Sequence, residues 1–279
     1  MTTTTPDIPG AAQAPAPTAA RLREAFDRRE FVLHYQPKMD ARSRSITGLE
    51  ALMRWNVPEQ GLVDPARFMD ALESTPLMVE VGFWAIKQAL ADLRQWREFG
   101  AKMRVAVNVA NIQLYDSRFV ELVRQAQAEA GIPDGLDLEV TEDGLTRHLD
   151  GVMRTLNGLR DLGVRVAVDH FGSSRSALPY VARMALDSVK VDGVFVDGAL
   201  KDGGTRTVLG ALIGLAHGLG LSVIAEGVES EEQWKLLRGL HCDEVQGYLF
   251  SPARPAANIT RMLQVQSAPR RFLQLRRSG

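Results

Sequence analysis

Short strand-like runs alternate with longer amphipathic segments along most of this chain, and this alternation limits the fold more than any other feature. Eight runs are strand candidates: 31–37, 46–55, 103–110, 136–142, 164–171, 187–192, 221–227 and 243–250. Helical periodicity is clearest at 81–100, 117–132 and 204–220. Gly100, Gly131, Gly163 and Gly220 each follow a helical run, where a helix C-terminus favours glycine. Eight strands with intervening helices in about 250 residues predict a (β/α)₈ barrel of the TIM type, in the α/β class.

The connection between the first two candidate strands modifies this prediction. Only the polar turn DARSRS, residues 40–45, joins them, with no helix between. We therefore expect a hairpin, and hence one antiparallel strand in a mostly parallel barrel. A doubly wound open sheet is the competing fold, but the sequence lacks the glycine-rich dinucleotide fingerprint that would support it.

Composition limits the domain organisation and the partners. The 279 residues, 45% of them hydrophobic, suit one large core. Residues 1–20 are mostly Thr, Pro and Ala, so we expect a disordered tail there, with the barrel domain at 21–279 and a C-terminal extension in its last residues. A net charge of −1 gives no reason to expect a nucleic acid, and no apolar run reaches the roughly 20 residues of a membrane segment. The single cysteine, Cys242, and the lack of a signal peptide favour a cytoplasmic protein.

Polar residues fall near the C-terminal end of almost every candidate strand. Because side chains alternate between the two faces of a strand, Glu50, Leu52 and Arg54 share one face. The other strands add Asn108, Glu139, Asp169, Lys190 with Asp192, Glu226 and Gln246. In a barrel these ends converge on one mouth, where the active sites of this fold lie.

Several carboxylates at one mouth would repel one another unless positive charge lay between them. Mg²⁺ takes oxygen ligands of this kind, and two such ions about 4 Å apart would stabilise a phosphoryl displacement. A lysine there could orient the water or neutralise the transition state. The pattern therefore predicts a metal-dependent enzyme with an anionic substrate. The alternatives are structural: Asp192 as the ion-pair partner of Lys190, and Asn108 as a turn residue bonded to the backbone.

Ordered motifs from Arg21 to Met262 carry a family resemblance. They are YQP, GLEALMRW with Glu50-Ala51-Leu52 inside it, GLVDPARF, VAVNVA, LDLEVTE, VKVDGVFV, AEGVESEEQ and VQGYLF. In these motifs the chain resembles the EAL-domain family of cyclic di-GMP phosphodiesterases. The resemblance implies hydrolysis of cyclic di-GMP to linear pGpG at a two-metal site that uses Mg²⁺ or Mn²⁺.

The resemblance also implies a role for each matching position. The first metal would be held by Glu50, Asn108, Glu139 and Asp169, with Asp169 shared by the second metal. Glu226 matches a ligand of the second metal or the catalytic base, and Lys190 matches the lysine beside the attacking water. Glu50, Lys190 and Glu226 are thus the catalytic candidates.

The remaining matches concern the substrate and a loop. The dinucleotide would be held by Gln36, Leu52, Arg54 and Gln246, and Arg54 suits a phosphate through its fork of donors. Asp192 and Glu229 match acidic residues that support the cluster. Glu142 matches the acid that anchors the loop after Asp169.

That loop departs from the family pattern, which resembles DDFGTGYSSL where this chain has DHFGSSRSAL. His170 replaces an aspartate that binds the second metal, and Ser174 and Arg175 replace the glycine and tyrosine of a loop linked to dimerisation. As a ligand, His170 would suit Mn²⁺ or Zn²⁺ better than Mg²⁺. Alternatively it packs elsewhere, as its parity opposite to Asp169 suggests if the strand continues. A proline expected at Ala253 is also displaced.

Two functional classes stay open at this point. The chain is a phosphodiesterase, or it is a receptor that binds cyclic di-GMP and passes the signal to a protein partner. A protein that serves only as an interaction scaffold fits less well, because a chain that had lost its ligand site would have no reason to keep so many polar residues at its strand ends. A homodimer is compatible with each reading.

Overall fold

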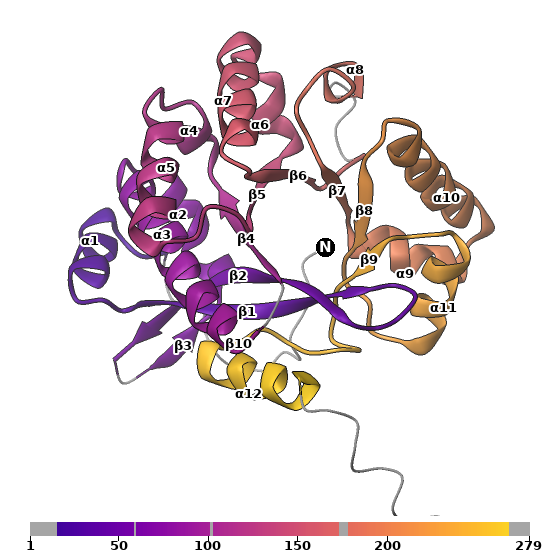
Figure 1. Ribbon diagram of the computed structural model, residues 1–279, viewed down its shortest axis with the longest axis horizontal. Coiled ribbons are helices and arrows are strands. Elements are labelled where there is room, and N and C mark those ends of the chain that lie inside the picture. Colours follow the sequence, from indigo (N-terminus) through magenta and orange to yellow (C-terminus); the bar gives the residue numbers. More distant parts are fainter. Residues whose placement is uncertain (1–15, 59, 101–102, 173–177, 268–279) are drawn as a thin grey trace, which may run out of the picture.

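The strands of the protein curve into a closed barrel that helices surround (Figure 1). The computed structural model describes residues 16–58, 60–100, 103–172 and 178–267. The barrel strands are β1 (Phe31–Asp40), β2 (Ile46–Val57), β4 (Arg104–Val109), β5 (Leu136–Thr141), β6 (Arg165–Asp169), β7 (Ser188–Val191), β8 (Ser222–Ala225) and β9 (Glu244–Val245). Two short strands, β3 (Gly61–Val63) and β10 (Arg254–Pro255), pair with β2 and β1.

Helices lie on the outside of the barrel between most of these strands. The longer ones are α1 (Ala19–Asp27), α3 (Leu77–Glu98), α5 (Phe119–Ala130), α7 (Leu149–Asp161), α9 (Gly193–Lys201), α10 (Gly203–Gly218), α11 (Glu231–Gly239) and α12 (Ala256–Ser267). The short ones are the 3₁₀ turn η1 (Pro65–Arg67), α2 (Met69–Glu73), α4 (Asn111–Leu114), α6 (Glu142–Thr146) and α8 (Leu178–Val181). None of the helices within the described ranges is long and apolar enough to cross a membrane.

The order of the strands confirms the predicted barrel. Hydrogen-bonded neighbours run β1–β9–β8–β7–β6–β5–β4–β2, and pairing of β1 with β2 closes the ring. The strand β1 is antiparallel to both β2 and β9, whereas the other barrel pairs are parallel. The predicted hairpin supplies the one antiparallel strand. The predicted helix end at Gly131 is also confirmed, because this glycine caps α5 in the left-handed region at φ 67°.

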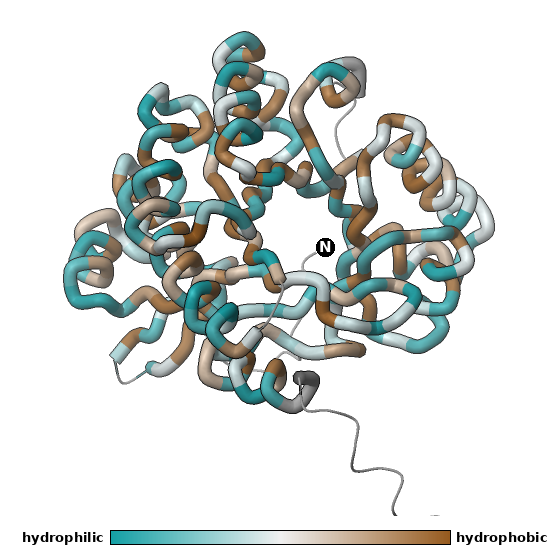
Figure 2. Tube along the Cα trace, viewed as in Figure 1, coloured by the Kyte–Doolittle hydropathy of each residue, from teal (hydrophilic) through white to brown (hydrophobic). Residues whose placement is uncertain are grey.

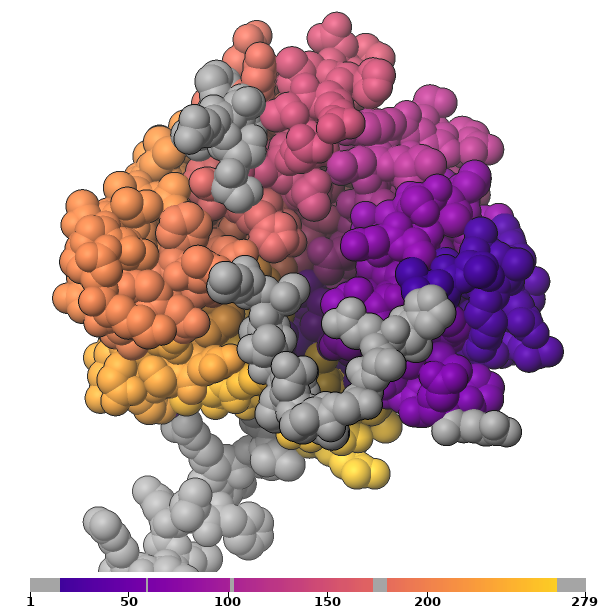
Figure 3. Space-filling view, turned by 180° about the vertical axis from the view of Figure 1, so that it is seen from behind, coloured from indigo at the N-terminus to yellow at the C-terminus, as the bar shows by residue number. Residues whose placement is uncertain are grey.

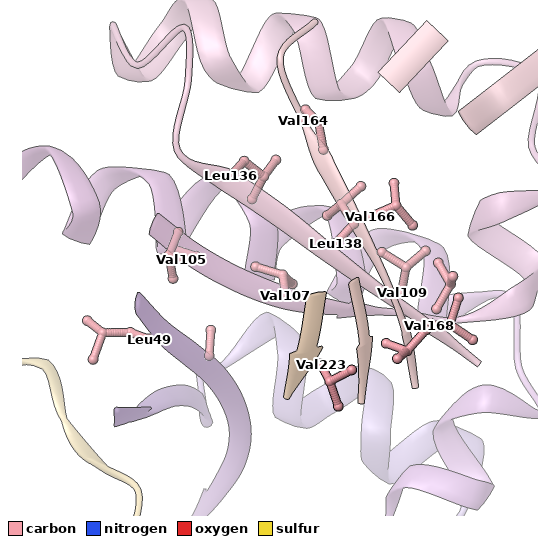
Figure 4. Close-up of a cluster of buried hydrophobic side chains, with 14 of the residues drawn as sticks. Leu49, Val105, Val107, Val109, Leu136, Leu138, Val164, Val166, Val168 and Val223 are labelled. Atoms are coloured by element: carbon pink, nitrogen blue, oxygen red, sulfur yellow. The ribbon is translucent and has the colours of Figure 1, made fainter. Parts of the chain in front are cut away.

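Alternation along the strands separates an apolar outer face from a polar inner one. Figure 2 shows both hydrophobic and hydrophilic residues along the barrel strands. Leu136, Leu138 and Val140 of β5 are at most 1% exposed and belong to the main core between strands and helices. Equivalent residues of the neighbouring strands join them, as Figure 4 shows for Val105, Val107, Val166 and Val168. The intervening residues of β5, Asp137 and Glu139, face the inside of the barrel, where polar side chains gather.

A second, smaller core lies beneath the first helix. Leu22 of α1 packs with Phe31, Trp55, Phe68 and Leu72, and the rings of Trp55 and Phe68 meet edge to face at 5.7 Å. The helix α1 begins at Ala19, after Thr18, whose side chain accepts a hydrogen bond from the Arg21 N–H. Most of the tail predicted for residues 1–20, and the last part of the predicted C-terminal extension, lie outside the described residues.

Candidate active site

Strand register brings the polar residues of neighbouring strands side by side. Gln36 of β1 pairs with Glu50 of β2, and Asn108 of β4 pairs with Glu139 of β5. A shift of one residue would turn each of these side chains toward the helices, so the apolar outer face fixes the polar inner one. Seen from the side opposite to Figure 1, the surface is hollowed near its centre, between the indigo and purple elements and the orange and yellow ones (Figure 3).

The ammonium group of Lys190, on β7, lies at the centre of these residues. Its Nζ atom is 2.6 Å from Glu139 Oε2 and 2.7 Å from Glu226 Oε1. It is also 3.2 Å from Glu50 Oε2 and 4.0 Å from Asp169 Oδ1. The Lys190 side chain is 1% exposed, so one buried cation lies among four carboxylates from different parts of the barrel.

Glu50 is further held by two amide side chains. Asn108 Nδ2 donates to Glu50 Oε1 at 2.8 Å, and Gln246 Nε2 donates to Glu50 Oε2 at 2.7 Å. Gln246 Nε2 also lies 2.9 Å from Gln36 Oε1, and Gln36 Nε2 donates to the backbone oxygen of Ser251 at 3.0 Å. The expected metal and substrate residues from β1, β2, β4 and the segment after β9 therefore form one connected network.

Burial and mutual repulsion raise the pKa of some of these carboxylates, whereas ion pairs and hydrogen bonds lower the pKa of Glu50. Burial raises the pKa of Glu50, but the charge of Lys190 and the Asn108 and Gln246 hydrogen bonds outweigh it, so this pKa lies below its ordinary value. Burial and the charge of Glu50 hold the pKa of Glu139 above its ordinary value, and burial does the same for the pKa of Glu226. These carboxylates also raise the pKa of Lys190 well above its ordinary value, against the effect of burial.

The donor set fits hard divalent cations. Within the described ranges no three His, Cys, Asp or Glu side chains are already arranged around a common metal position, and the Lys190 ammonium lies between the carboxylates instead. Among the described residues, these four carboxylates share the single charge of Lys190, and one of them, Glu139, also lies 3.5 Å from a second buried lysine, Lys38. Burial is the main cause of the raised pKa values of Glu139 and Glu226, and the negative charge of Glu50 adds to it. Oxygen donors short of positive charge are what Mg²⁺ or Mn²⁺ would satisfy.

His170 lies beside the cluster rather than away from it. Strand β6 ends at Asp169, and His170 adopts the left-handed region at φ 56°, so the alternation of a continuing strand does not apply. Its Nδ1 atom is 3.2 Å from Asp192 Oδ2, and its Nε2 atom is 3.6 Å from Asp169 Oδ2. Asp192 also accepts a hydrogen bond from the Val194 N–H at 2.8 Å, which makes it the N-cap of α9.

The segment directly after β6 is held by hydrogen bonds to two neighbouring elements, since the Phe171 N–H donates to the backbone oxygen of Lys190 at 3.0 Å. The backbone N–H of Gly172 donates to Glu142 Oε2 at 3.2 Å, and Glu142 is 1% exposed at the start of α6. Ser174 and Arg175 lie outside the described residues. The homodimer expectation, which was linked to that loop, therefore stays a prediction.

Cavities flank the carboxylate cluster on two sides. One of about 510 Å³ is lined by residues that include Gln36, His170, Asp192, Glu226, Glu229, Gln246 and Tyr248. The other, of about 300 Å³, is more apolar and is lined by Leu52, Met53, Met69 and Met78 together with Asn108, Glu139 and Asp169. Arg54 lines neither of these two cavities, and its Nη1 atom donates to the backbone oxygen of Met53 at 2.8 Å.

The structure adds two residues that the sequence analysis did not select. Tyr248 is 63% exposed at the larger cavity, and Lys38 is buried inside the barrel below Glu139. The available signal for Lys38 was its parity, since it lies two residues after Gln36 in the same strand.

Comparisons with known proteins agree with this geometry. The family model described as EAL domain matches residues 19–253. The chain is 38% identical over 245 residues to the cyclic di-GMP phosphodiesterase NbdA of Pseudomonas aeruginosa. It is 36% identical over 240 residues to MucR of the same organism, a bifunctional diguanylate cyclase/cyclic di-GMP phosphodiesterase. These alignments cover 87% and 85% of this chain but only 31% and 35% of the relatives, so the chain spans about a third of their length.

Solved structures of EAL proteins are similar to this chain in fold and in sequence. The PaMucR phosphodiesterase in its c-di-GMP complex has a TM-score of 0.82 and 36% identity, over 86% of this chain and 98% of that one. The EAL enzyme Bd1971, in a form with cAMP and cyclic di-GMP bound, has a TM-score of 0.84 and 32% identity, over 88% of this chain and 67% of that one.

Proposed function

Because the chain belongs to the EAL-domain family, we propose that it is a metal-dependent phosphodiesterase that opens cyclic di-GMP to linear pGpG. The observation that carries this proposal is the set of four carboxylates within 4.0 Å of the Lys190 ammonium. The relatives named as cyclic di-GMP phosphodiesterases support the choice of substrate.

The metal would be held by the residues that the family resemblance selects. Glu50, Asn108, Glu139 and Asp169 are the proposed ligands of a first Mg²⁺ or Mn²⁺. Asp169 would be shared with a second cation, and Glu226 is either a ligand of that second cation or the catalytic base. Bound there, the cations would polarise the scissile phosphate and neutralise the charge that develops on it.

The chain's own residues would perform the remaining steps. Water would attack phosphorus and give up a proton while one phosphorus–oxygen bond to a ribose breaks, and the leaving ribose oxygen would take up a proton in its place, so that protons balance. Glu226, with its side chain 24% exposed and its pKa raised by burial, is suited to accept the proton of the attacking water. Lys190, fixed by carboxylates, would stabilise the negative charge on the phosphate oxygens.

The two cavities offer room for the two halves of a cyclic dinucleotide on either side of the cluster. Gln36 and Gln246 border the larger cavity and Leu52 the smaller one. Arg54 is the proposed phosphate contact, and Asp192 and Glu229 would support the polar wall of the larger cavity.

A second candidate function is a receptor that binds cyclic di-GMP without hydrolysing it. The position of His170 favours this alternative, because an imidazole rather than a carboxylate lies between Asp169 and Asp192. Such a protein would keep the substrate contacts and lack a complete second metal site.

One experiment separates the two functions. The purified chain is incubated with cyclic di-GMP and either Mg²⁺ or Mn²⁺, and pGpG release and ligand binding are measured separately. Release of pGpG supports the enzyme, and binding without release supports the receptor. Absence of both would contradict the proposed function.

A further inference from the structure

Lys38, on β1, is a second buried lysine inside the barrel, and none of the proposed roles uses it. Its side chain is 4% exposed, and its Nζ atom lies 3.5 Å from Glu139 Oε1. The other oxygen of the same carboxylate, Glu139 Oε2, is 2.6 Å from Lys190 Nζ. Two lysines therefore hold the two oxygens of Glu139.

The local backbone makes room for the Lys38 side chain. The register between β1 and β2 shifts between Lys38 and Met39, an irregularity of the kind that redirects side chains near functional sites. Gly48 is the residue opposite Lys38 on β2. A Cβ atom on Gly48 would lie 3.3 Å from Lys38 Cε and 3.2 Å from the backbone oxygen of Arg104, so a side chain there would crowd the lysine.

Asp137, the second carboxylate within 4.0 Å of Lys38, already has a partner. Lys38 Nζ is 3.9 Å from Asp137 Oδ2, but Arg104 Nε donates to Asp137 Oδ1 at 2.5 Å. The negative charge of Asp137 is therefore balanced by Arg104 and does not require Lys38. Glu139 is 1% exposed and has no such arginine among its described partners.

We propose that Lys38 is a positioning residue, which holds Glu139 Oε1 so that Oε2 stays directed toward the proposed cation site. The inference rests on the proposed metal-dependent function. With a cation bound at the proposed site, Lys38 would still fix the orientation of the Glu139 carboxylate. Groups that orient a metal ligand contribute about 10- to 100-fold to metal affinity.

Charge alone predicts the opposite effect. Lys38 is a cation close to the proposed site, so its removal would strengthen the attraction of a divalent ion if orientation were unimportant. The direction of the change in metal affinity therefore distinguishes positioning from simple repulsion.

The test is a Mn²⁺ titration of the full chain, with free Mn²⁺ measured by electron paramagnetic resonance at one pH and ionic strength. We expect Lys38→Met to raise the dissociation constant for Mn²⁺ by about 10- to 100-fold. Gly48→Ala keeps the charge but displaces the lysine, so it should change the affinity in the same direction by a smaller factor. Lys87→Met is the control, because Lys87 is 43% exposed on α3 and pairs with Glu129 far from the cluster.

Unchanged or tighter Mn²⁺ binding in Lys38→Met would overturn the positioning role while leaving the proposed function intact. If that variant does not fold, as judged by circular dichroism, Gly48→Ala decides, and wild-type affinity in it overturns the role. A wild-type chain that binds no Mn²⁺ would instead contradict the metal-dependent function itself.

Discussion

Glu50 on β2 and Lys190 on β7 meet across the inside of the barrel, with 3.2 Å between Oε2 and Nζ. These strands are not neighbours in the sheet, so the contact joins opposite walls. It depends on closure of the barrel, which is why the sequence separation of 140 residues does not prevent it. The arrangement makes Glu50 the most direct residue to test.

We predict that Glu50→Ala abolishes pGpG release, with a loss of at least about 100-fold, because the variant lacks a proposed ligand of the first cation. The fold should remain, since Lys190 keeps its contacts with Glu139 and Glu226. Chromatography of the products and a thermal melt measure the two effects. Glu121→Gln, at an exposed residue of α5, is the control. Wild-type turnover in Glu50→Ala would refute the site assignment.

A second prediction concerns Arg54. If its guanidinium holds a phosphate of cyclic di-GMP, Arg54→Ala should weaken binding by about 1.5–3 kcal/mol, the usual range for a hydrogen bond to a charged group. Calorimetry with cyclic di-GMP measures this, with Arg94→Ala on α3 as the matched arginine control. An unchanged affinity would show that Arg54 keeps its contact with the Met53 carbonyl and makes none with the ligand.

The strands, and the residues that face the inside of the barrel, could be predicted from the sequence, because side chains along a strand alternate with a period of two. The buried apolar face of each strand enforces this alternation. Glu50, Asn108 and Glu139 were therefore identifiable before the structure. The position of the His170 side chain could not be predicted. Its backbone adopts the left-handed region and so ends the alternation, and the sequence contains no signal for that conformation. Lys38 shares the parity of Gln36, but parity does not tell whether a lysine on that face contacts carboxylates or reaches solvent. Arg54 shows that parity fixes a face but not the side-chain conformation.

Acid stability provides a prediction independent of the site. Burial raises the pKa of Glu30, but hydrogen bonds from Trp55 and Arg21 outweigh it, so the folded-state pKa lies below the ordinary value. This stabilisation is therefore present above about pH 4.5 and is lost as the pH falls through the lower folded-state pKa. Glu30→Gln should reduce the free energy of unfolding by about 1–3 kcal/mol at neutral pH and by less in acid. Urea unfolding at several pH values measures this difference, and a difference that grows in acid would contradict it.

Cys242 should be chemically inert in the folded protein. It is 2% exposed, and burial raises the pKa of its thiol to about 12, so the reactive thiolate is scarce near neutral pH. A thiol reagent such as dithionitrobenzoate should react with the native chain only at the rate of unfolding, and rapidly in denaturant. Rapid reaction in native buffer would show that the segment around β9 opens easily.

The last prediction concerns His170, whose ring lies between Asp169 and Asp192. Mg²⁺ prefers oxygen ligands in a strict octahedron, whereas Mn²⁺ accepts a nitrogen ligand more readily. We therefore expect higher pGpG release with Mn²⁺ than with Mg²⁺ in the wild type. His170→Asp restores an oxygen donor and should raise Mg²⁺-dependent turnover with little change in substrate affinity.

The control for this substitution is His241→Asp, since His241 also has a left-handed backbone, at φ 62°, but lies at an exposed turn after α11. Turnover with both metals is measured for the three proteins by pGpG release. A wild type already fully active with Mg²⁺ and indifferent to His170→Asp would refute this account of the histidine. If His170→Asp bound cyclic di-GMP yet stayed inert with both metals, the cause would lie elsewhere than in the missing carboxylate, and the receptor function would be favoured.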